Sequence, residues 1–332
     1  MPPGDRKNPK RAASSESDFS LMEFMRYFPD DDACLDYLWR TRYSPDGEHA
    51  LCPHCEVERT FRHYAESRQA WTCVACGHRI YVTAGTIFHK SSTSLHLWFY
   101  AMYLMSSTRC GISAKQLERE LGVTYKTAWR MFTLIRNELM TQDDDAPLNG
   151  HVEMDEMYVG GKPRNSDRAR WAKQAEPHGA LAPAVRRSLA IRHGIESKTQ
   201  VFGAVERKGK VTAHVIPSRQ QPTLMAHVAR RVDAGAVVYT DTAHAYGALR
   251  QEHHTVNHHE RVFVSGDVHT QTIDGFWSLV KRGISGTHHA VSPKWLQGYL
   301  NEYVWRYNHR DDPRAMFALL LLRAALPRVA DA

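Results

Sequence analysis

Three aspartates occupy positions from which their side chains could converge on divalent metal ions: Asp155, Asp241 and Asp274. The first lies in the β-type run HVEMDEMYVG, and the second ends the β-type run AVVYTD. The third lies in a segment with helical apolar spacing, and Lys281 follows it on the same helix face. Two carboxylates on strands and a third on a later helix can hold two Mg²⁺ ions, which clamp the attacking and leaving oxygens of a phosphodiester. The alternative for each is a solvated surface carboxylate, since the chain has 36 Asp and Glu residues.

Two CxxC pairs, separated by 17 residues, supply four candidate metal ligands: Cys52, Cys55, Cys73 and Cys76. Tandem pairs at this spacing are typical of a tetrahedral Cys₄ zinc ribbon, because each pair supplies two thiolates from a tight turn. A ribbon over residues 51–84 is too small to be stabilised by burial alone, so bound Zn²⁺ would supply folding energy. His54 and His78 are alternative ligands, although four thiolates already complete the zinc shell.

Residues 85–141 have the apolar spacing of helices and include a helix-turn-helix pattern. Ser113 and Thr124 are expected to cap two consecutive helices, which a glycine turn separates. The exposed side of the second helix would offer Lys126 and Arg130 to the major groove of DNA. A plain helical hairpin gives a similar pattern, and DNA recognition is the interpretation that we prefer.

The following segments predict an α/β domain with a mixed sheet. The β-type runs are 151–160, 199–207, 210–217 and 236–241. A helix is expected at residues 224–232, between the last two runs. A basic insertion over residues 163–193 interrupts this pattern, and residues 160–193 hold eight Lys or Arg against two acids. A basic segment beside a candidate active site suits a polyanionic substrate, whereas the alternative is a solvated surface loop. Helical stripes follow, and the last covers residues 314–326.

Length and composition bound the remaining possibilities. A chain of 332 residues has room for two or three domains, and 43 Lys and Arg against 36 Asp and Glu give a net charge of +7. No apolar run approaches the length of a transmembrane helix, so we expect a cytoplasmic protein with no membrane segment. Residues 1–18 are polar and predict a disordered tail, and residues 19–50 predict short helices. Cysteines in such a protein favour metal binding over disulfides.

Together these motifs resemble the transposases of the IS1595 insertion-sequence family, which have an ISXO2-like catalytic domain. The resemblance covers the chain from about residue 20 to about residue 320. The segments that carry it are FPDDDACLDYLWRTRY before CPHC, MDEMYVGGK, YTDTAHAY, HTQTIDGFWSLVKRGISGTHHAVS and YLNEYVWRYNHR. It implies an RNase H-like catalytic domain over residues 148–326, preceded by the zinc ribbon and the helical region, with a DDE-type active site and cut-and-paste chemistry on DNA.

The resemblance also implies roles for individual residues. Asp155, Asp241 and Asp274 become the ligands of Mg²⁺ or Mn²⁺, and Lys281 becomes their basic companion. Lys281 and Arg282 would then contact DNA phosphates.

One position departs from the family pattern, because Glu is common where this chain has Asp274. Some members have Asn or His as the third ligand, which makes His269 and Gln271 alternative contributors. Glu156 follows the first aspartate, but adjacent strand residues face opposite ways, so we expect it to be structural.

The expected function is therefore that of a DNA transposase that binds terminal inverted repeats and catalyses metal-dependent cleavage and strand transfer. Its partners would be double-stranded DNA and at least a second copy of the chain, since two transposon ends must be paired. DNA binding would associate the protein with the nucleoid. The alternatives are a non-catalytic DNA-binding regulator derived from a transposase and a structure-selective nuclease. The presence of all three acids with Lys281 favours the transposase.

Overall fold

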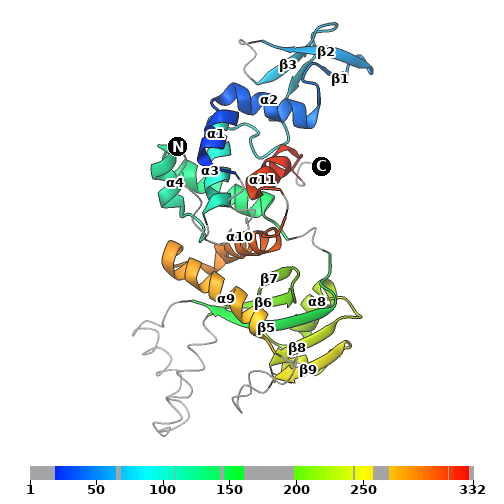
Figure 1. Cartoon of the computed structure of the whole chain (residues 1–332), viewed down its shortest axis with the longest axis vertical. Coiled ribbons are helices and arrows are strands. Elements are labelled where there is room, and N and C mark those ends of the chain that lie inside the picture. Colours follow the sequence, from blue (N-terminus) through cyan, green and yellow to red (C-terminus); the bar gives the residue numbers. More distant parts are fainter. Residues whose placement is uncertain are drawn as a thin grey trace, which may run out of the picture. The chain divides into compact units, whose positions relative to one another are not determined.

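The computed structural model describes residues 19–64, 69–108, 110–142, 146–160, 198–241, 244–256, 269–312 and 314–328 (Figure 1). The predicted tail (1–18) and the predicted basic insertion (163–193) lie outside the described residues. The chain divides into two compact units, of which the first comprises Met1–Leu139 and His309–Ala332 and the second comprises Met140–Asn308.

The first unit consists of helices and a small antiparallel sheet. Its helical elements are α1 (Leu21–Tyr27), α2 (Asp31–Arg42), α3 (Leu95–Ser107), α4 (Ala114–Leu121), α5 (Tyr125–Leu134), the π-helix η2 (Ile135–Leu139) and α11 (Met316–Ala325). Its described strands pair in the order β1 (His49–Leu51), β2 (Glu58–His63), β3 (Ala70–Cys73) and β4 (Arg79–Tyr81). This sheet packs on α2 through Trp39, whose ring stacks on Trp71 at 5.0 Å between centroids.

The turn between α4 and α5 forms as its residues predict. The side chain of Ser113 accepts a hydrogen bond from the backbone N–H of Gln116, and Thr124 does the same for Thr127. Gly122 ends α4 in the left-handed region, at φ 62°, where a residue without a side chain is least strained. The helix caps predicted at Ser113 and Thr124 are therefore confirmed.

Helix α11 packs in the first unit, although it follows the second unit in the sequence. The ring of Phe317 lies 5.7 Å from that of Phe24 and 5.9 Å from that of Phe28, between centroids. The predicted catalytic domain extended to residue 326, whereas the second unit ends at Asn308. An apolar helix can pack against any apolar surface, so the sequence pattern alone does not indicate where α11 packs.

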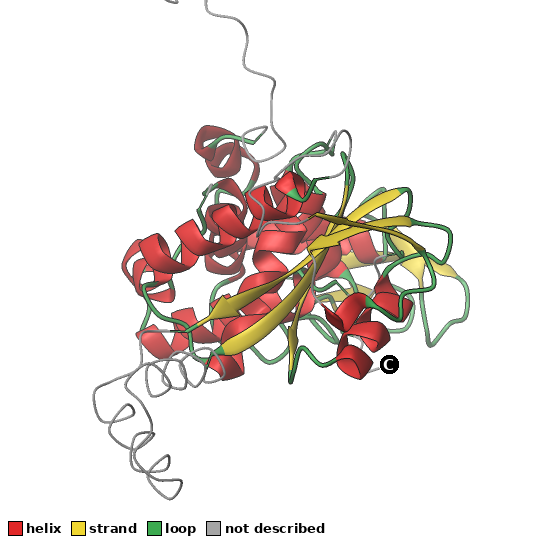
Figure 2. Ribbon diagram, turned by 90° about the horizontal axis from the view of Figure 1, so that it is seen from below, coloured by secondary structure: helices red, strands yellow, loops and turns green. Residues whose placement is uncertain are grey.

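The second unit contains a mixed sheet that, in its described residues, has the order β7-β6-β5-β8-β9. The strands are β5 (His151–Val159), β6 (Thr199–Glu206), β7 (Val211–Ile216), β8 (Val237–Asp241) and β9 (Glu252–Val256), drawn in yellow in Figure 2. Strands β5, β6 and β7 are antiparallel neighbours, whereas β8 is parallel to both β5 and β9. The predicted mixed α/β domain is therefore confirmed, and β9 is an additional strand. Its sequence, EHHTV, lacks the apolar alternation that would have predicted it.

Helices cover both faces of this sheet. The described helical elements are α8 (Gln221–Arg231), η4 (His244–Tyr246), α9 (Gln271–Gly283), η6 (Ile284–His288), η7 (Pro293–Trp295) and α10 (Leu296–Asn308). One apolar core joins α9 and α10 to the sheet face that presents Met157 and Val205. The other core joins α8 to the face that presents Met154 and Phe202. Odd-numbered residues of β5 therefore face α9, and even-numbered ones face α8.

Close approach of α9 to the sheet depends on a glycine. Gly203 of β6 lies directly opposite Asp155 of β5 in the antiparallel register. A Cβ atom at Gly203 would lie 2.3 Å from Cζ2 of Trp277, so the indole ring of α9 occupies the space that a side chain would need. The missing side chain allows α9 to pack beside the strand that carries Asp155.

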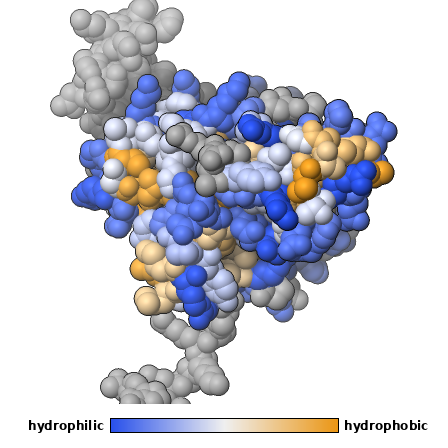
Figure 3. Space-filling model, turned by 90° about the horizontal axis from the view of Figure 1, so that it is seen from above, coloured by the Kyte–Doolittle hydropathy of each residue, from blue (hydrophilic) through white to orange (hydrophobic). Residues whose placement is uncertain are grey.

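Among the described residues, no helix is long and apolar enough to span a membrane. The surface seen in Figure 3 is mostly hydrophilic, with a few apolar patches.

Candidate active site and zinc centre

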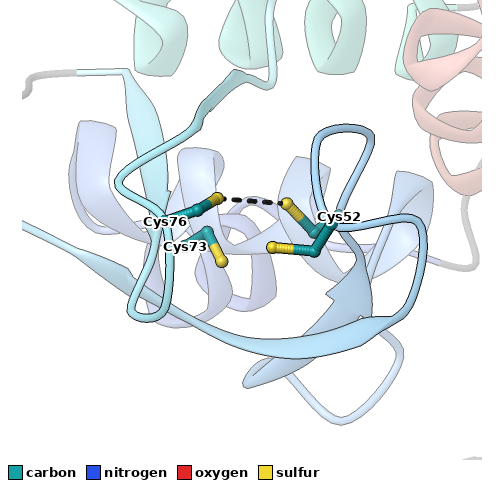
Figure 4. A group of neighbouring side chains, drawn as sticks. Cys52, Cys73 and Cys76 are labelled. Carbon is teal, nitrogen blue, oxygen red and sulfur yellow. Dashed lines mark hydrogen bonds between the residues drawn. The ribbon is translucent and has the colours of Figure 1, made fainter.

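The four cysteines of the two CxxC pairs come together in the small sheet of the first unit (Figure 4). Cys52 follows β1, Cys73 ends β3, and each of the other two lies in the turn that follows. Their Sγ atoms all lie within 4.8 Å of one another, and those of Cys52 and Cys76 are 3.6 Å apart. Zn–S bonds of about 2.3 Å imply S···S separations of about 3.8 Å in a tetrahedral site. The four thiols thus have the donor set and spacing to hold Zn²⁺, whereas His54 and His78 are not part of the cluster.

The three predicted acids lie on elements that meet at one face of the larger sheet. Asp155 is on β5, Asp241 ends β8, and Asp274 is in the first turn of α9. Glu153 pairs with Tyr239 in the parallel register of β5 and β8, so Asp155 and Asp241 each lie two residues further along neighbouring strands. Because two residues is the repeat of a strand, both point to the face that α9 covers.

The surroundings of Asp155 disfavour its negative charge. Burial is the largest cause that raises the pKa of Asp155, and the negative charge of Glu156 is the next. The charges of Asp241 and Asp274 raise it further, and the pKa of Asp155 is about 7. Asp155 and Asp241 are half-buried, whereas Asp274 is exposed, so solvent reaches the site. The charges on these acids repel one another, and a bound divalent cation would offset this repulsion.

Glu156 points to the opposite face of the sheet, as strand alternation predicts. The hydroxyl of Tyr246, in η4, donates a hydrogen bond to Oε1 of Glu156. Burial raises the pKa of Glu156, and the hydrogen bond from Tyr246 partly offsets this effect. Tyr246 itself is buried in the core beneath α8. Glu156 therefore adds negative charge near Asp155 from the α8 side of the sheet.

The predicted basic residues are solvent-exposed. Lys281 and Arg282 lie in the last turn of α9, and Lys281 shares the exposed side of this helix with Asp274. Lys126 and Arg130 are exposed on α5 in the first unit, where the guanidinium of Arg130 lies 5.9 Å from the ring centre of Trp98. All four are accessible to a polyanion.

The structure also reveals two residues that the sequence did not single out, Glu153 and Arg207. Glu153 is a fully buried acid on the same strand face as Asp155, and Arg207 Nε donates to its Oε1 at 2.8 Å. His269, an alternative third ligand, has Nδ1 3.2 Å from the same oxygen. Gln271, the other alternative, is the exposed first residue of α9. The sequence did contain one sign that Glu153 has a structural role, because it is an acid at an inward-facing strand position. Its partners could not be identified from the sequence, because they are distant in the chain.

Replacing Asp155 by Asn should stabilise the protein in the absence of Mg²⁺ at pH 8. The pKa of Asp155, about 7, lies above its usual value of 3.8, so the folded state binds this proton more tightly than the unfolded state. The resulting stability is complete below pH 4 and is lost as the pH rises through 7. Asn cannot ionise, so the variant should gain about 4 kcal/mol at pH 8 and only about 1 kcal/mol at pH 4.5, at about 1.4 kcal/mol for each pH unit that separates the two pKa values.

Denaturant unfolding of the zinc-loaded protein at both pH values measures this difference. Asp274→Asn is the matched control, because its carboxylate is exposed and its removal should change the free energy of unfolding little. An equal gain from Asp155→Asn at both pH values would contradict the pH argument.

The zinc centre predicts one Zn²⁺ per chain, bound by the four clustered cysteines. Cys73→Ser should lower the zinc content of the purified protein and loosen the small sheet, because one of the four thiolates is lost. Cys110→Ser is the control, since Cys110 is exposed and lies outside the cluster. Elemental analysis measures the zinc content. Full zinc content in Cys73→Ser would rule out this ligand set.

Comparisons with known proteins match the two parts of the chain that contain these residues. Residues 147–308 match the ISXO2-like transposase domain, and residues 29–79 match the transposase zinc-ribbon domain of the IS1595 family. The chain is 32% identical over 269 residues to an uncharacterized protein in transposable element ISH50 of Halobacterium salinarum. This match covers 77% of the chain and 84% of that protein. No solved structure shows a significant match. The chain belongs to the IS1595 family of transposases.

Proposed function

We propose that this protein is a DDE-type transposase, a polynucleotidyl transferase that binds the terminal inverted repeats of an insertion sequence and catalyses DNA cleavage and strand transfer. The observation that carries the proposal is the placement of the three acids: Asp155 and Asp241 lie in register on neighbouring strands β5 and β8, and Asp274 lies in the first turn of α9, which packs on the same sheet face. The match of residues 147–308 to a transposase domain supports it. The mixed sheet, with three antiparallel strands followed by two parallel ones, is compatible with an RNase H-like catalytic fold.

The three acids have the chemistry to hold divalent cations. Asp155, Asp241 and Asp274 would bind Mg²⁺ or Mn²⁺, and such ions, when bound, activate the attacking oxygen and stabilise the leaving oxygen of a phosphodiester. The half-buried Asp155 has lost part of its hydration and is repelled by its neighbours, which favours exchange of its proton for a cation. Exposure of Asp274 leaves the site open on the side where DNA would approach.

Basic residues near the acids would hold the DNA backbone. Lys281 and Arg282 extend from the same helix as Asp274, so phosphates that they bind would lie along α9. In the first unit, the pair α4–α5 is proposed to act as a helix-turn-helix with α5 as its recognition helix. The zinc ribbon would contribute to binding of the transposon ends. A homodimer or larger assembly on DNA is part of this proposal, because the two ends must be paired.

The catalytic proposal predicts that Asp155→Asn and Asp241→Asn each reduce cleavage by at least about 10³-fold. Binding to DNA that carries the inverted repeats flanking the gene should change little, because these acids hold metal and not bases. Cleavage should require Mg²⁺ or Mn²⁺ and stop with a chelator. Asp274→Asn should also abolish cleavage, whereas Asp274→Glu should keep activity if α9 adjusts by the length of one methylene.

A gel-based assay for cut and joined products separates the alternatives. Glu252→Gln is the control. Glu252 is an exposed acid that begins β9, whereas Asp241 pairs with Val256 at the other end of that strand. Cleavage without joined products would indicate a nuclease, and binding without cleavage would indicate a regulator. Full activity in Asp274→Asn would move the third ligand elsewhere, with His269 and Gln271 next to be tested.

The DNA-binding proposal predicts that Lys126→Ala with Arg130→Ala weakens binding to end DNA by at least about tenfold at moderate salt. The slope of log affinity against log salt should fall by about two, since about one counterion is released per phosphate contact. Fluorescence anisotropy over a salt series measures both quantities. Lys115→Ala with Arg119→Ala on α4 removes the same charge and should spare the preference for end DNA over random DNA. Equal loss of preference in both double variants would locate recognition outside α5.

A further inference from the structure

Helix α9 begins without a cap of its own. Thr270 is its N-cap residue, yet the side chain of Thr270 makes no capping hydrogen bond. The first N–H groups of a helix have no partner within the helix and must be satisfied by other groups. Here the partner is Glu153, a residue of β5 that is 119 residues away in sequence from Thr272.

The carboxylate of Glu153 binds the first turn of α9 with both oxygens. The backbone N–H groups of Thr272 and Ile273 donate to Oε2 at 2.8 and 3.1 Å, and the Thr272 hydroxyl donates to Oε1 at 3.0 Å. With Arg207 Nε on Oε1, four donors occupy a carboxylate that has about four lone-pair sites. Glu153 therefore has no oxygen free to bind a metal ion, although it shares a strand face with Asp155.

Arg207 extends this contact to the third element of the site. Its Nη2 donates to the backbone carbonyl of His269, just before α9, at 2.8 Å. Its guanidinium lies 4.1 Å from the ring centre of Tyr239 on β8. Glu153 and Arg207 thus connect β5, β8 and α9, the elements that carry the three acids.

The spacing of these contacts relative to the acids is the same on each element. Glu153 precedes Asp155 by two residues, Tyr239 precedes Asp241 by two, and Thr272 precedes Asp274 by two. A displacement of any anchor would therefore move the acid next to it by a similar amount. Charge-assisted hydrogen bonds to a helix N-terminus are among the strongest that a buried carboxylate can make.

We propose that Glu153, held by Arg207, is a positioning residue that caps α9 and sets the distance of Asp274 from Asp155 and Asp241. The proposal rests on the proposed function, because it concerns metal binding by those three acids. Glu153 does not touch DNA or metal in this mechanism. It acts through the helix that carries the third acid.

The test uses the full-length, zinc-loaded protein and two measurements that do not depend on activity. Hydrogen exchange reports on the amides of Thr272 and Ile273, and electron paramagnetic resonance of free Mn²⁺ reports on metal affinity. Glu153→Gln should speed exchange at the start of α9 and weaken Mn²⁺ binding by about tenfold, the range found when a group behind a metal ligand is lost. Thr272→Val removes one donor to Glu153 and keeps the shape of the side chain. It should also speed exchange at the start of α9 and weaken Mn²⁺ binding, but by less than Glu153→Gln.

The decisive comparison is made in the Asp274→Asn background. There Glu153→Gln should weaken Mn²⁺ binding by less than about twofold, because the helix no longer carries a ligand. Glu302→Gln is the matched control: Glu302 is equally buried and pairs with Arg306 at 3.0 Å on α10. It should leave both α9 exchange and Mn²⁺ affinity unchanged.

The outcomes separate the two proposals. If Glu153→Gln weakens Mn²⁺ binding equally with and without Asp274, or does not weaken it, the positioning role is wrong. If Asp155→Asn binds Mn²⁺ as tightly as the unmodified protein, the acids do not hold metal, and the proposed function fails together with the positioning role. Should Glu153→Gln not fold, Thr272→Val in both backgrounds gives the same decision.

Discussion

The burial of Asp155 beside other acids is the constraint on which the second unit depends. Asp155 and Asp241 lie on neighbouring strands, and Asp274 lies in the first turn of α9. Burial is the largest cause that raises the pKa of Asp155 to about 7, the negative charge of Glu156 is the next, and the charges of Asp241 and Asp274 add to it. Such an arrangement destabilises the fold when no cation is bound. The elements that carry the acids must therefore be held together by contacts elsewhere.

Two kinds of contact hold α9 against the sheet. Apolar packing brings Ile273, Trp277 and Val280 onto the face that presents Met157 and Val205. The absence of a side chain at Gly203 gives Trp277 the space that it occupies. Packing alone resists separation of the helix from the sheet more than sliding along it, whereas the directional hydrogen bonds to Glu153 restrain sliding. Together the two contacts determine where Asp274 lies.

The first unit is stabilised by different means. Its small sheet has a limited core, to which α2 contributes Trp39 against Trp71, and its four cysteines gather at one place. A metal ion bound there would cross-link both CxxC turns and so replace part of the missing apolar burial. The helices of this unit are instead held by aromatic contacts, in which α11 takes part through Phe317.

The sequence by itself determined what depends on local spacing. Four features could be predicted from the sequence: the cysteine pairs, the caps at Ser113 and Thr124, the opposite facing of Asp155 and Glu156, and membership of the IS1595 family. These signals are local because turns, caps and strand faces involve residues a few positions apart. Only the tertiary structure decided that Glu153 caps a helix 119 residues away, that Gly203 lies opposite Asp155, that EHHTV forms β9, and that α11 packs in the first unit. Each of these depends on which distant surfaces meet. A buried glutamate, a glycine or an apolar helix has the same local pattern whatever its partner is.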